Sequence, residues 1–279
     1  MTVESWLRTT TRSLSAAGIA TARLDALVLL EDAVGQNRGY LLAHPELEIT
    51  ASKLDQLTNL LTSRAQHVPL SYLRGQQEFY GRSFFVAPGV LVPRPESETM
   101  IDQLKTLFLD LADQPGDASD NDKWQLADIG TGSGALGITA ALELPKTQVS
   151  LIEIDDAAIT IAKTNVISFA TDTPIIQSDL LATCSTNYDV LLCNLPYVPD
   201  DYPINKAAEH EPKLALFGGA DGLDLYRRLF QQISNLSVKP LYILTEALPA
   251  THNDLAVSAV AAGYKLQNSV DFIQIFVLK

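Results

Sequence analysis

Cysteine and histidine are scarce in this sequence. Its 279 residues include two cysteines, Cys184 and Cys193, and four scattered histidines. The cysteines have neither a metal-binding spacing nor the density of a disulfide-stabilised scaffold, and the histidines form no zinc motif. We therefore expect no metal site and no disulfide framework, and a reducing cytoplasmic environment.

Long apolar runs and basic clusters are also missing. No stretch approaches the length of a membrane span, and Met1 to Ser5 lacks the basic and apolar pattern of a signal peptide. Acidic residues number 33 against 20 lysines and arginines, a formal net charge of −13. Because non-specific nucleic-acid binding needs clustered basic side chains, we expect no direct nucleic-acid partner and no membrane partner.

The composition that remains, 47% hydrophobic and 19% charged, fits one large α/β domain with a smaller one. Residues 1–75 have helical periodicity, which predicts helices over Ala22–Val34 and Ser52–Ala65. Aromatic residues on both sides of Gly81-Arg82-Ser83 predict a β-hairpin linker over residues 76–92. Nothing in 1–75 looks catalytic, which leaves substrate recognition or stabilisation as its role.

From residue 93 onward, strands alternate with helices. Short apolar runs predict strands at 125–129, 149–152, 175–176, 188–193 and 241–244, and two more near Leu266 and Ile273. This alternation predicts a doubly wound sheet with helices on both faces, in a domain of residues 93–279. Residues 110–123 are acidic and rich in turn formers, so we expect a solvated loop there.

A glycine-rich turn follows the first of these strands. Gly132-Ser133-Gly134-Ala135-Leu136-Gly137 fits the dinucleotide fingerprint G-x-G-x-x-G, and Glu153 lies where an acid would meet a ribose diol. The alternative begins at Asp128, whose carboxylate would repel a pyrophosphate but suits a cationic amino group such as that of S-adenosylmethionine. Asp179, after a later strand, either accepts from an adenine amino group or caps a helix.

The decisive stretch is Asn194-Leu195-Pro196-Tyr197, at the end of an apolar strand. An amide or aromatic amino nitrogen is a poor nucleophile because its lone pair is delocalised. The Asn194 side-chain oxygen and a main-chain carbonyl of Leu195-Pro196 could accept both N–H protons and favour rehybridisation towards a methyl donor. The plainer interpretation is a strand-to-loop turn that proline stiffens. Taken with the glycine loop, the stretch favours the methyl donor over a nicotinamide cofactor.

Two neighbouring segments leave alternatives open. Residues 93–98 form either an ordinary proline-rich helix start capped by Ser97 or Glu96, or a border of the cofactor cleft made by Arg94, Glu96 and Glu98. The long segment 199–222 follows the asparagine stretch, and the sequence does not decide whether it covers the site.

These motifs resemble the release-factor glutamine methyltransferases, the PrmC/HemK family, over nearly the whole chain. The glycine loop alone indicates only a class I (Rossmann-like) methyltransferase. The similarity in the amino-terminal half is more specific, and it lies in Arg23-Leu24-Asp25-Ala26, Leu41-Leu42-Ala43-His44-Pro45, Pro69-Leu70-Ser71-Tyr72-Leu73, Glu78-Phe79-Tyr80-Gly81 and Leu91-Val92-Pro93-Arg94-Pro95-Glu96-Ser97-Glu98. Asp221-Gly222-Leu223 resembles the stretch after the family's active-site loop.

The resemblance implies methyl transfer from S-adenosylmethionine to the glutamine side chain in the Gly-Gly-Gln loop of peptide chain release factors, docked by the helical domain. The implied donor site combines the glycine loop at the methionine part, an acid at the ribose and two residues around the adenine. In this numbering the implied cofactor-binding residues are Asp128, Gly130, Thr131, Gly132, Ser133, Gly134, Glu153, Asp179, Leu180 and Asn194. The implied catalytic residues, which would hold the glutamine amide, are Asn194, Leu195, Pro196 and Tyr197.

Three positions depart from the family pattern. Leu195 replaces the first proline of Asn-Pro-Pro-Tyr, so a fixed φ is lost and an N–H is gained, and we expect weaker preorganisation without loss of function. Leu180 stands where an aromatic residue is frequent, which predicts looser adenine packing. Glu153 stands where aspartate is common.

The sequence leaves other functions open. Asn-Leu-Pro-Tyr also occurs in adenine dimethylases of ribosomal RNA, although the acidic charge and the amino-terminal half disfavour an adenine N(6)-methyltransferase acting on RNA or DNA. A glutamine methyltransferase of a ribosomal protein would share nearly every motif. A degenerate module that only docks a partner is the non-enzymatic alternative. For the enzyme we expect in-line transfer without a metal or a covalent enzyme intermediate.

Overall fold

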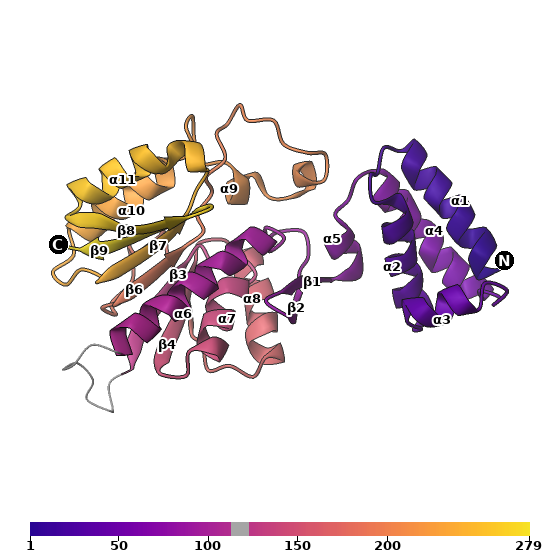
Figure 1. Cartoon of the computed structure of the whole chain (residues 1–279), viewed down its shortest axis with the longest axis horizontal. Helices are drawn as coiled ribbons and strands as arrows, with labels where there is room; N and C mark the ends of the chain where they lie inside the picture. The colour runs from indigo at the N-terminus through magenta and orange to yellow at the C-terminus, as the bar shows by residue number, and fades with distance from the viewer. Residues whose placement is uncertain (113–122) are drawn as a thin grey trace. The chain divides into compact units, whose positions relative to one another are not determined.

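The computed structural model describes residues 1–112 and 123–279. These residues form two compact units (Figure 1). The helical unit comprises 1–76 together with 204–210, and the sheet unit comprises the described residues of 77–203 and 211–279. The predicted loop at 110–123 begins later than expected, because a helix continues to Ala112, and the remainder of that prediction lies almost wholly outside the described residues. Within the described ranges, no helix is both long and apolar enough to cross a bilayer.

Five helices build the amino-terminal part of the helical unit. They are α1 (Val3–Ala16), α2 (Ala22–Val34), α3 (Arg38–Ala43), α4 (Ala51–Ala65) and α5 (Leu70–Arg74). As the sequence predicts, α2 ends at Gly35, which takes the left-handed conformation (φ 72°) that glycine adopts without a steric penalty. Leu29, Leu30 and Leu57 are fully buried between the helices. The segment 204–210, with the 3₁₀ turn η2 (Ala208–His210), completes this unit.

A hairpin follows the five helices in the chain. Strands β1 (Gln76–Phe79) and β2 (Arg82–Phe85) form a two-stranded sheet. The turn lies at Tyr80-Gly81, not at the predicted Gly81-Arg82-Ser83. Both residues have positive φ (52° and 69°), as the central pair of a type I′ turn requires, and a non-glycine residue at the first position concealed it.

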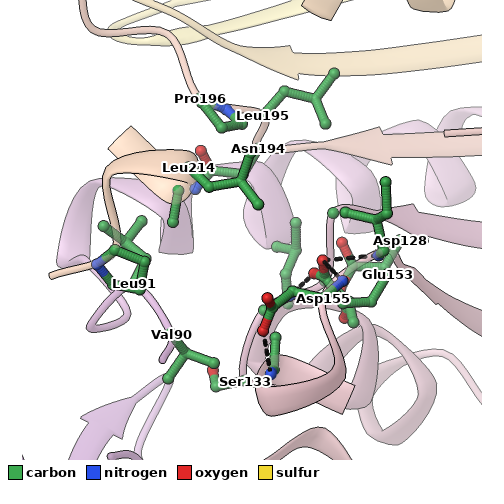
Figure 2. Close-up of a pocket in the computed structure, with 18 of the residues that line it drawn as sticks. Val90, Leu91, Asp128, Ser133, Glu153, Asp155, Asn194, Leu195, Pro196 and Leu214 are labelled. Carbon is green, nitrogen blue, oxygen red and sulfur yellow. Dashed lines mark hydrogen bonds between the residues drawn. The ribbon is translucent and has the colours of Figure 1, made fainter. Parts of the chain in front are cut away.

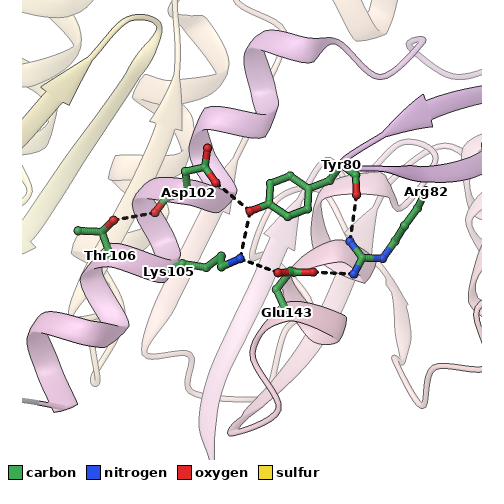
Figure 3. A network of polar contacts seen from close by, with 6 residues as sticks. All are labelled: Tyr80, Arg82, Asp102, Lys105, Thr106 and Glu143. Atoms are coloured by element: carbon green, nitrogen blue, oxygen red, sulfur yellow. Dashed lines mark hydrogen bonds and ion pairs between the residues drawn. The ribbon is translucent and has the colours of Figure 1, made fainter.

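Polar contacts fix this hairpin to helices α6 (Glu98–Ala112) and α7 (Ala135–Glu143) (Figure 3). Tyr80 Oη donates to Asp102 Oδ1 (2.8 Å). Lys105 Nζ donates to Tyr80 Oη (3.2 Å) and Glu143 Oε2 (2.6 Å), and Arg82 donates to Glu143 Oε1 (2.6 Å). Because these groups are partly exposed, the network orients the hairpin more than it stabilises the fold.

The sheet unit is built on seven strands. They are β3 (Trp124–Ile129), β4 (Thr147–Glu153), β5 (Ile175–Gln177), β6 (Val190–Cys193), β7 (Tyr242–Glu246), β8 (Tyr264–Val270) and β9 (Ile273–Leu278). Their order is β5-β4-β3-β6-β7-β9-β8, parallel except that β9 pairs antiparallel with β7 and β8. The remaining elements are α8 (Asp156–Ser168), α9 (Lys213–Leu216), α10 (Asp224–Ser234), α11 (His252–Ala261), η1 (Pro95–Ser97) and η3 (Pro249–Thr251).

Helices cover both faces of this sheet (Figure 1). On one face, Leu104 of α6 and Ile138 of α7 pack with Leu192 of β6. On the other, Leu229 of α10 and Leu255 of α11 pack with neighbouring strand residues. The strands alternate between the two cores and are nearly continuously apolar, as expected for a parallel sheet buried on both sides. The predicted doubly wound α/β fold is confirmed.

The strand order places the site. The chain leaves β3 towards β4 on one side and passes from β6 to β7 on the other, so the order reverses between the adjacent strands β3 and β6. In open α/β sheets, ligands bind in the crevice at the carboxyl ends of the strands where this reversal occurs. Gly130 follows β3 and Asn194 follows β6, at that edge.

Candidate active site

A cavity opens at the carboxyl ends of β3, β4 and β6 (Figure 2). Nearly all of the predicted site residues line it, from both the glycine loop and the asparagine stretch. Those that do are Asp128, Gly130, Thr131, Gly132, Ser133, Glu153, Asp179, Leu180, Asn194, Leu195 and Pro196. Gly134 and Tyr197 do not line it. Gly134 lies at the amino end of α7, and Tyr197 points its hydroxyl towards the protein interior.

Asp128 holds the glycine loop. Its Oδ2 accepts hydrogen bonds from Thr131 Oγ1 (2.5 Å) and from the Gly137 N–H (2.8 Å), the latter in the first turn of α7. Burial raises the pKa of Asp128 to about 6, with a further contribution from Glu153, while the two hydrogen bonds act in the opposite direction. Asp128 therefore shapes the loop through Oδ2, and neither of these bonds uses Oδ1.

Glu153 closes the loop from the next strand. Its Oε2 accepts from the Gly132 N–H (2.9 Å), and its Oε1 accepts from the N–H groups of Ile154 (2.8 Å) and Asp155 (3.1 Å). Gly132 has a φ of 56°, and a Cβ built there meets no atom within 4 Å. The loop backbone is thus held in place from behind and open to a ligand in front.

Asn165 of α8 supports the same loop and the hairpin. It is buried, its Nδ2 donates to the carbonyls of Ser133 (2.8 Å) and Phe85 (2.9 Å), and its Oδ1 accepts from the Phe85 N–H (2.7 Å). One side-chain amide therefore joins α8, the glycine loop and the end of β2.

The predicted adenine end is more polar than expected. Asp179 forms an ion pair with Arg228 of α10, and both side chains are about half exposed. Arg228 and Leu225 of α10 also line the cavity. Leu180 is buried and has a positive φ (54°), an uncommon conformation for leucine. The adenine contact predicted for Asp179 would share its carboxylate with Arg228.

The charge around the cavity is predominantly negative. Four carboxylates line it, from Asp128, Glu153, Asp155 and Asp179, against the guanidinium groups of Arg94 and Arg228. Arg94 is paired with Glu211, which does not line the cavity, and Arg228 is paired with Asp179. Among the described residues, Asp128, Glu153 and Asp155 are therefore left as the unpaired carboxylates of the lining. Such a cavity disfavours a pyrophosphate and suits a cationic ligand with an amino group and a ribose diol. The side chains present therefore fit S-adenosylmethionine better than a dinucleotide.

Asn194 contacts a residue far away in the sequence. Its Nδ2 donates to Ser97 Oγ (2.9 Å), and Ser97 is buried at the end of η1, immediately before α6. Of the two helix caps predicted, Ser97 or Glu96, the hydroxyl oxygen of Ser97 accepts from Asn194 and not from a backbone N–H of α6. Of the alternative cleft residues, Arg94 lines the cavity, whereas Glu98 accepts from the Tyr80 N–H (2.8 Å) and is structural.

Leu195, which stands where the family pattern has proline, packs into the protein interior. Its side chain is buried, and its Cδ2 would lie 3.1 Å from a Cβ placed on Gly130, so the two site segments are in direct contact. The N–H that proline would lack approaches Tyr226 Oη at 3.4 Å. Tyr226 is fully buried, and the carbonyl oxygens of Cys193 and Glu246 both lie within acceptor distance of its single hydroxyl proton. The extra N–H therefore has an acceptor.

Two glycines pack against the carbonyls of this turn. A Cβ on Gly218 would lie 2.3 Å from the Pro196 carbonyl oxygen, and one on Gly222 would lie 2.2 Å from that of Tyr197. Because real Cβ atoms do not approach oxygens so closely, only glycine fits at either position. The carbonyls of the turn are thereby held from outside.

The segment 199–222 does reach the cavity. Its residues Pro212, Leu214 and Ala215 line it. Glu211 anchors this part of the segment, because its buried carboxylate accepts from Arg94 (2.6 Å) and from the Val92 N–H (3.1 Å).

Several residues of the site give no signal in the sequence. Arg228, Glu211, Tyr226, Glu246 and Asn165 lie in ordinary helix, strand or loop patterns. No local motif marks them, since each acts through partners distant in the sequence.

Comparison with known proteins agrees with this geometry. Residues 5–75 match the PrmC N-terminal domain, and residues 97–210 match the Methyltransferase small domain. A release factor glutamine methyltransferase of Koribacter versatilis is 34% identical over 84% of this chain and 81% of its own length. One from Moorella thermoacetica is 35% identical over 85% and 82%.

The chain belongs to the release factor glutamine methyltransferase family.

As a member of this family, the chain is an S-adenosylmethionine-dependent methyltransferase, in agreement with the charge of the cavity. A solved structure of the hMettl16 catalytic domain in complex with MAT2A 3′UTR hairpin 6 has a TM-score of 0.54. It is 15% identical and covers 78% of this chain and 81% of its own. At that identity the similarity concerns the fold alone. Membership of the methyltransferase family, and not this structural similarity, shows that the dinucleotide interpretation of the glycine loop is wrong.

Proposed function

We propose that this protein methylates the side-chain amide nitrogen of the glutamine in the Gly-Gly-Gln loop of peptide chain release factors. The observation that carries the proposal is the orientation of Asn194, whose Nδ2 is bound by Ser97 so that Oδ1 is left to accept a hydrogen bond at the cavity. The named activity of the relatives supports the same reaction.

The reaction needs a planar amide held by its two N–H groups. Asn194 Oδ1 accepts one N–H, and a carbonyl of Leu195-Pro196 accepts the other. Two acceptors that hold the N–H protons favour rehybridisation of the amide nitrogen. Its lone pair is then less conjugated with the substrate carbonyl and is directed at the methyl group. When bound, S-adenosylmethionine supplies that methyl group as an activated sulfonium substituent. The product amide loses its proton after transfer, so no general base is needed before attack.

For the donor, we propose contacts that divide along the cavity. Gly130 to Gly134, with Asp128 behind them, face the methionine part, and Glu153 accepts from the ribose hydroxyls. Leu180 packs on the adenine, with Asp179 near its amino group. The accepting and apolar groups on the cavity wall suit these parts of the molecule.

We further propose that residues 1–75 recognise the release factor and that residues 76–92 link this part to the catalytic domain at 93–279. The helical unit has its own buried core and a buried ion pair between Arg64 and Asp25 (2.7 Å). It can thus present a defined surface to a protein substrate. A reducing cytoplasm, where release factors work, stays the expected location.

The test is transfer of labelled methyl from S-adenosylmethionine to four acceptors side by side. These are a release factor, the same factor with its loop glutamine changed to alanine, ribosomal proteins and ribosomal RNA. We expect label only in the unmodified factor. Label in RNA would instead assign adenine methylation, and label in a ribosomal protein would assign that protein as the substrate. Donor binding without transfer to any acceptor would contradict the proposal.

A further inference from the structure

The turn after β4 brings a second carboxylate to the cavity. Glu153 ends this strand, and Asp155 follows two residues later, immediately before α8. Both side chains line the cavity (Figure 2). Of the two, only Glu153 has so far been assigned a contact with the donor.

Glu153 has little capacity left for a ligand. An ionised carboxylate offers about four positions at which its oxygens accept a hydrogen bond. Three of them serve the backbone, because Glu153 accepts from the N–H groups of Gly132 (2.9 Å), Ile154 (2.8 Å) and Asp155 (3.1 Å). The ribose of S-adenosylmethionine has two hydroxyl donors. While Glu153 holds the loop, it therefore accepts from only one of them, and the other needs a different acceptor.

Asp155 has the capacity that Glu153 lacks. Its Oδ1 accepts from the Ala158 N–H (2.9 Å) and so caps the amino end of α8. Its Oδ2 takes part in no hydrogen bond or ion pair within the part of the chain that the structure describes. One oxygen of this side chain thus fixes the carboxylate, and the other is left to accept an O–H at the cavity.

The turn that carries both acids is held by further bonds. The Asp155 N–H donates to Glu153 Oε1. The Gln177 side chain of β5 donates to the Ile154 carbonyl (3.2 Å) and to Asp156 Oδ1 (2.9 Å). The two carboxylates are therefore positioned before a ligand binds, which lowers the entropic cost of binding.

We propose that Asp155 accepts a hydrogen bond from one hydroxyl of the donor ribose, while Glu153 accepts from the other. The ribose diol is then shared between an acid that also shapes the glycine loop and an acid that also caps α8. This role of Asp155 rests on the donor contacts of the proposed function, but it does not depend on the identity of the methyl acceptor.

The experiment measures how strongly the protein prefers each ribose hydroxyl. The probes are S-adenosylhomocysteine and its 2′-deoxy and 3′-deoxy analogues, which carry no methyl group to transfer. Calorimetric titration gives the dissociation constant of each. We expect the parent to bind each analogue about tenfold more weakly than S-adenosylhomocysteine, because each analogue lacks one hydrogen bond to a carboxylate.

Asp155→Ser is the main variant. Serine caps a helix as well as aspartate does, but it has no second oxygen for the ligand. We expect this variant to bind S-adenosylhomocysteine about tenfold more weakly than the parent. It should also lose the preference over one of the two analogues, while the preference over the other stays at about tenfold.

Asp156→Asn is the matched control. It removes the neighbouring negative charge and keeps an oxygen for the Gln177 side chain, and Asp156 does not line the cavity. This variant should keep both preferences. A preference compares ligands on one variant, so a partly unfolded protein would weaken all three ligands alike and leave the preferences unchanged.

The outcomes separate the role of Asp155 from the donor contacts as a whole. If the parent prefers both hydroxyls and Asp155→Ser keeps both preferences, the role of Asp155 is overturned and the other donor contacts stand. A parent without either preference would overturn the proposed ribose contacts together with this role. Failure of the parent to methylate the release factor would contradict the proposed function alone, since binding of S-adenosylhomocysteine needs no methyl acceptor.

Discussion

The two ends of the cavity are held in different ways. At the glycine-loop end, Asp128 and Glu153 bind groups 3, 9 and 21 residues away in the sequence. At the asparagine end, Asn194, Leu195 and Tyr197 bind groups 97, 31 and 49 residues away. The first end is thus a local structure, and the second is assembled from η1, α10 and β7.

This difference predicts that donor binding and turnover depend on different parts of the protein. The glycine loop, residues 130–134, which we call the donor loop, is shaped by contacts within one β-α-β unit, so donor affinity should depend mainly on that unit. The turn of residues 194–197, which we call the acceptor turn after its proposed role, is shaped by the rest of the sheet. Its geometry, and with it kcat, should therefore respond to changes in distant elements.

Asn194→Ala should give the largest separation between the two ends. Removing the amide acceptor should lower kcat about 10³-fold, while donor affinity changes less than about threefold, because the glycine loop is held independently. Single-turnover methyl transfer and calorimetric donor titration measure the two effects. Asn268→Ala, on the exposed strand β8, is the matched control and should behave as the parent does. A parallel loss of donor affinity in Asn194→Ala would mean that the two ends are not separate.

Asp128→Asn tests the donor end through pH. The folded-state pKa of Asp128 is about 6 against an ordinary value of 3.8, so the folded protein keeps a proton that the unfolded chain has already lost. Stability from this group is therefore greatest at low pH and falls as the pH rises through about 6. Relative to Asp128→Asn, the free energy of unfolding of the parent should fall by about 2 kcal/mol between pH 4 and pH 7.

Urea denaturation of both proteins at several pH values in this range measures the difference. The asparagine keeps a side-chain oxygen for the Thr131 and Gly137 bonds, so the two proteins should differ mainly in charge. A difference that is independent of pH would contradict the raised pKa of Asp128.

Gly222→Ala tests how tightly the acceptor turn is held. The new Cβ would collide with the Tyr197 carbonyl, and we expect kcat to fall about tenfold with donor affinity nearly unchanged. Gly18→Ala provides the control, since Gly18 has almost the same φ (83° against 81°) but open space around a Cβ. Both variants carry the backbone strain of a left-handed alanine, and only one displaces the turn. Equal kcat in the two would show that turnover does not depend on the position of the Tyr197 carbonyl.

Leu195→Pro should have the smallest effect. It restores a fixed φ and removes an N–H whose bond to Tyr226 is long, so kcat should change less than about threefold. Stability should fall, because the buried leucine side chain that packs on Gly130 is lost. Leu195→Ala, which keeps the N–H but loses the same packing, separates the two causes when melting temperatures are compared. A large gain in kcat for the proline variant alone would show that the parent turn is poorly preorganised.

The difference between the two ends also explains what the sequence could predict. The alternation of strands and helices, and the position of nearly every strand, followed from apolar periodicity. The glycine loop was visible because its glycines, Asp128 and Glu153 lie within one short stretch, where spacing carries the information.

The acceptor end was only half visible. The residue types of Asn194 to Tyr197 identify them, but Ser97 is only one of two candidate helix caps in the sequence, because a serine before a helix often has that role. Glu246 and Tyr226 gave no signal, since an acid or a tyrosine at a strand or helix position has many ordinary explanations. Their roles depend on the order of strands in the sheet, which local patterns do not encode.

The side-chain amide of Asn165 connects the glycine loop to a backbone amide of the hairpin, so a change in the loop can be measured at the hairpin. The Phe85 N–H at the end of β2 and the Ser133 carbonyl in the glycine loop are bound by opposite ends of that one rigid group. A shift of the loop on donor binding must therefore alter the protection of the Phe85 proton against exchange with solvent. A single backbone amide in the hairpin can thus serve as a built-in reporter of donor occupancy, without any label attached to the site.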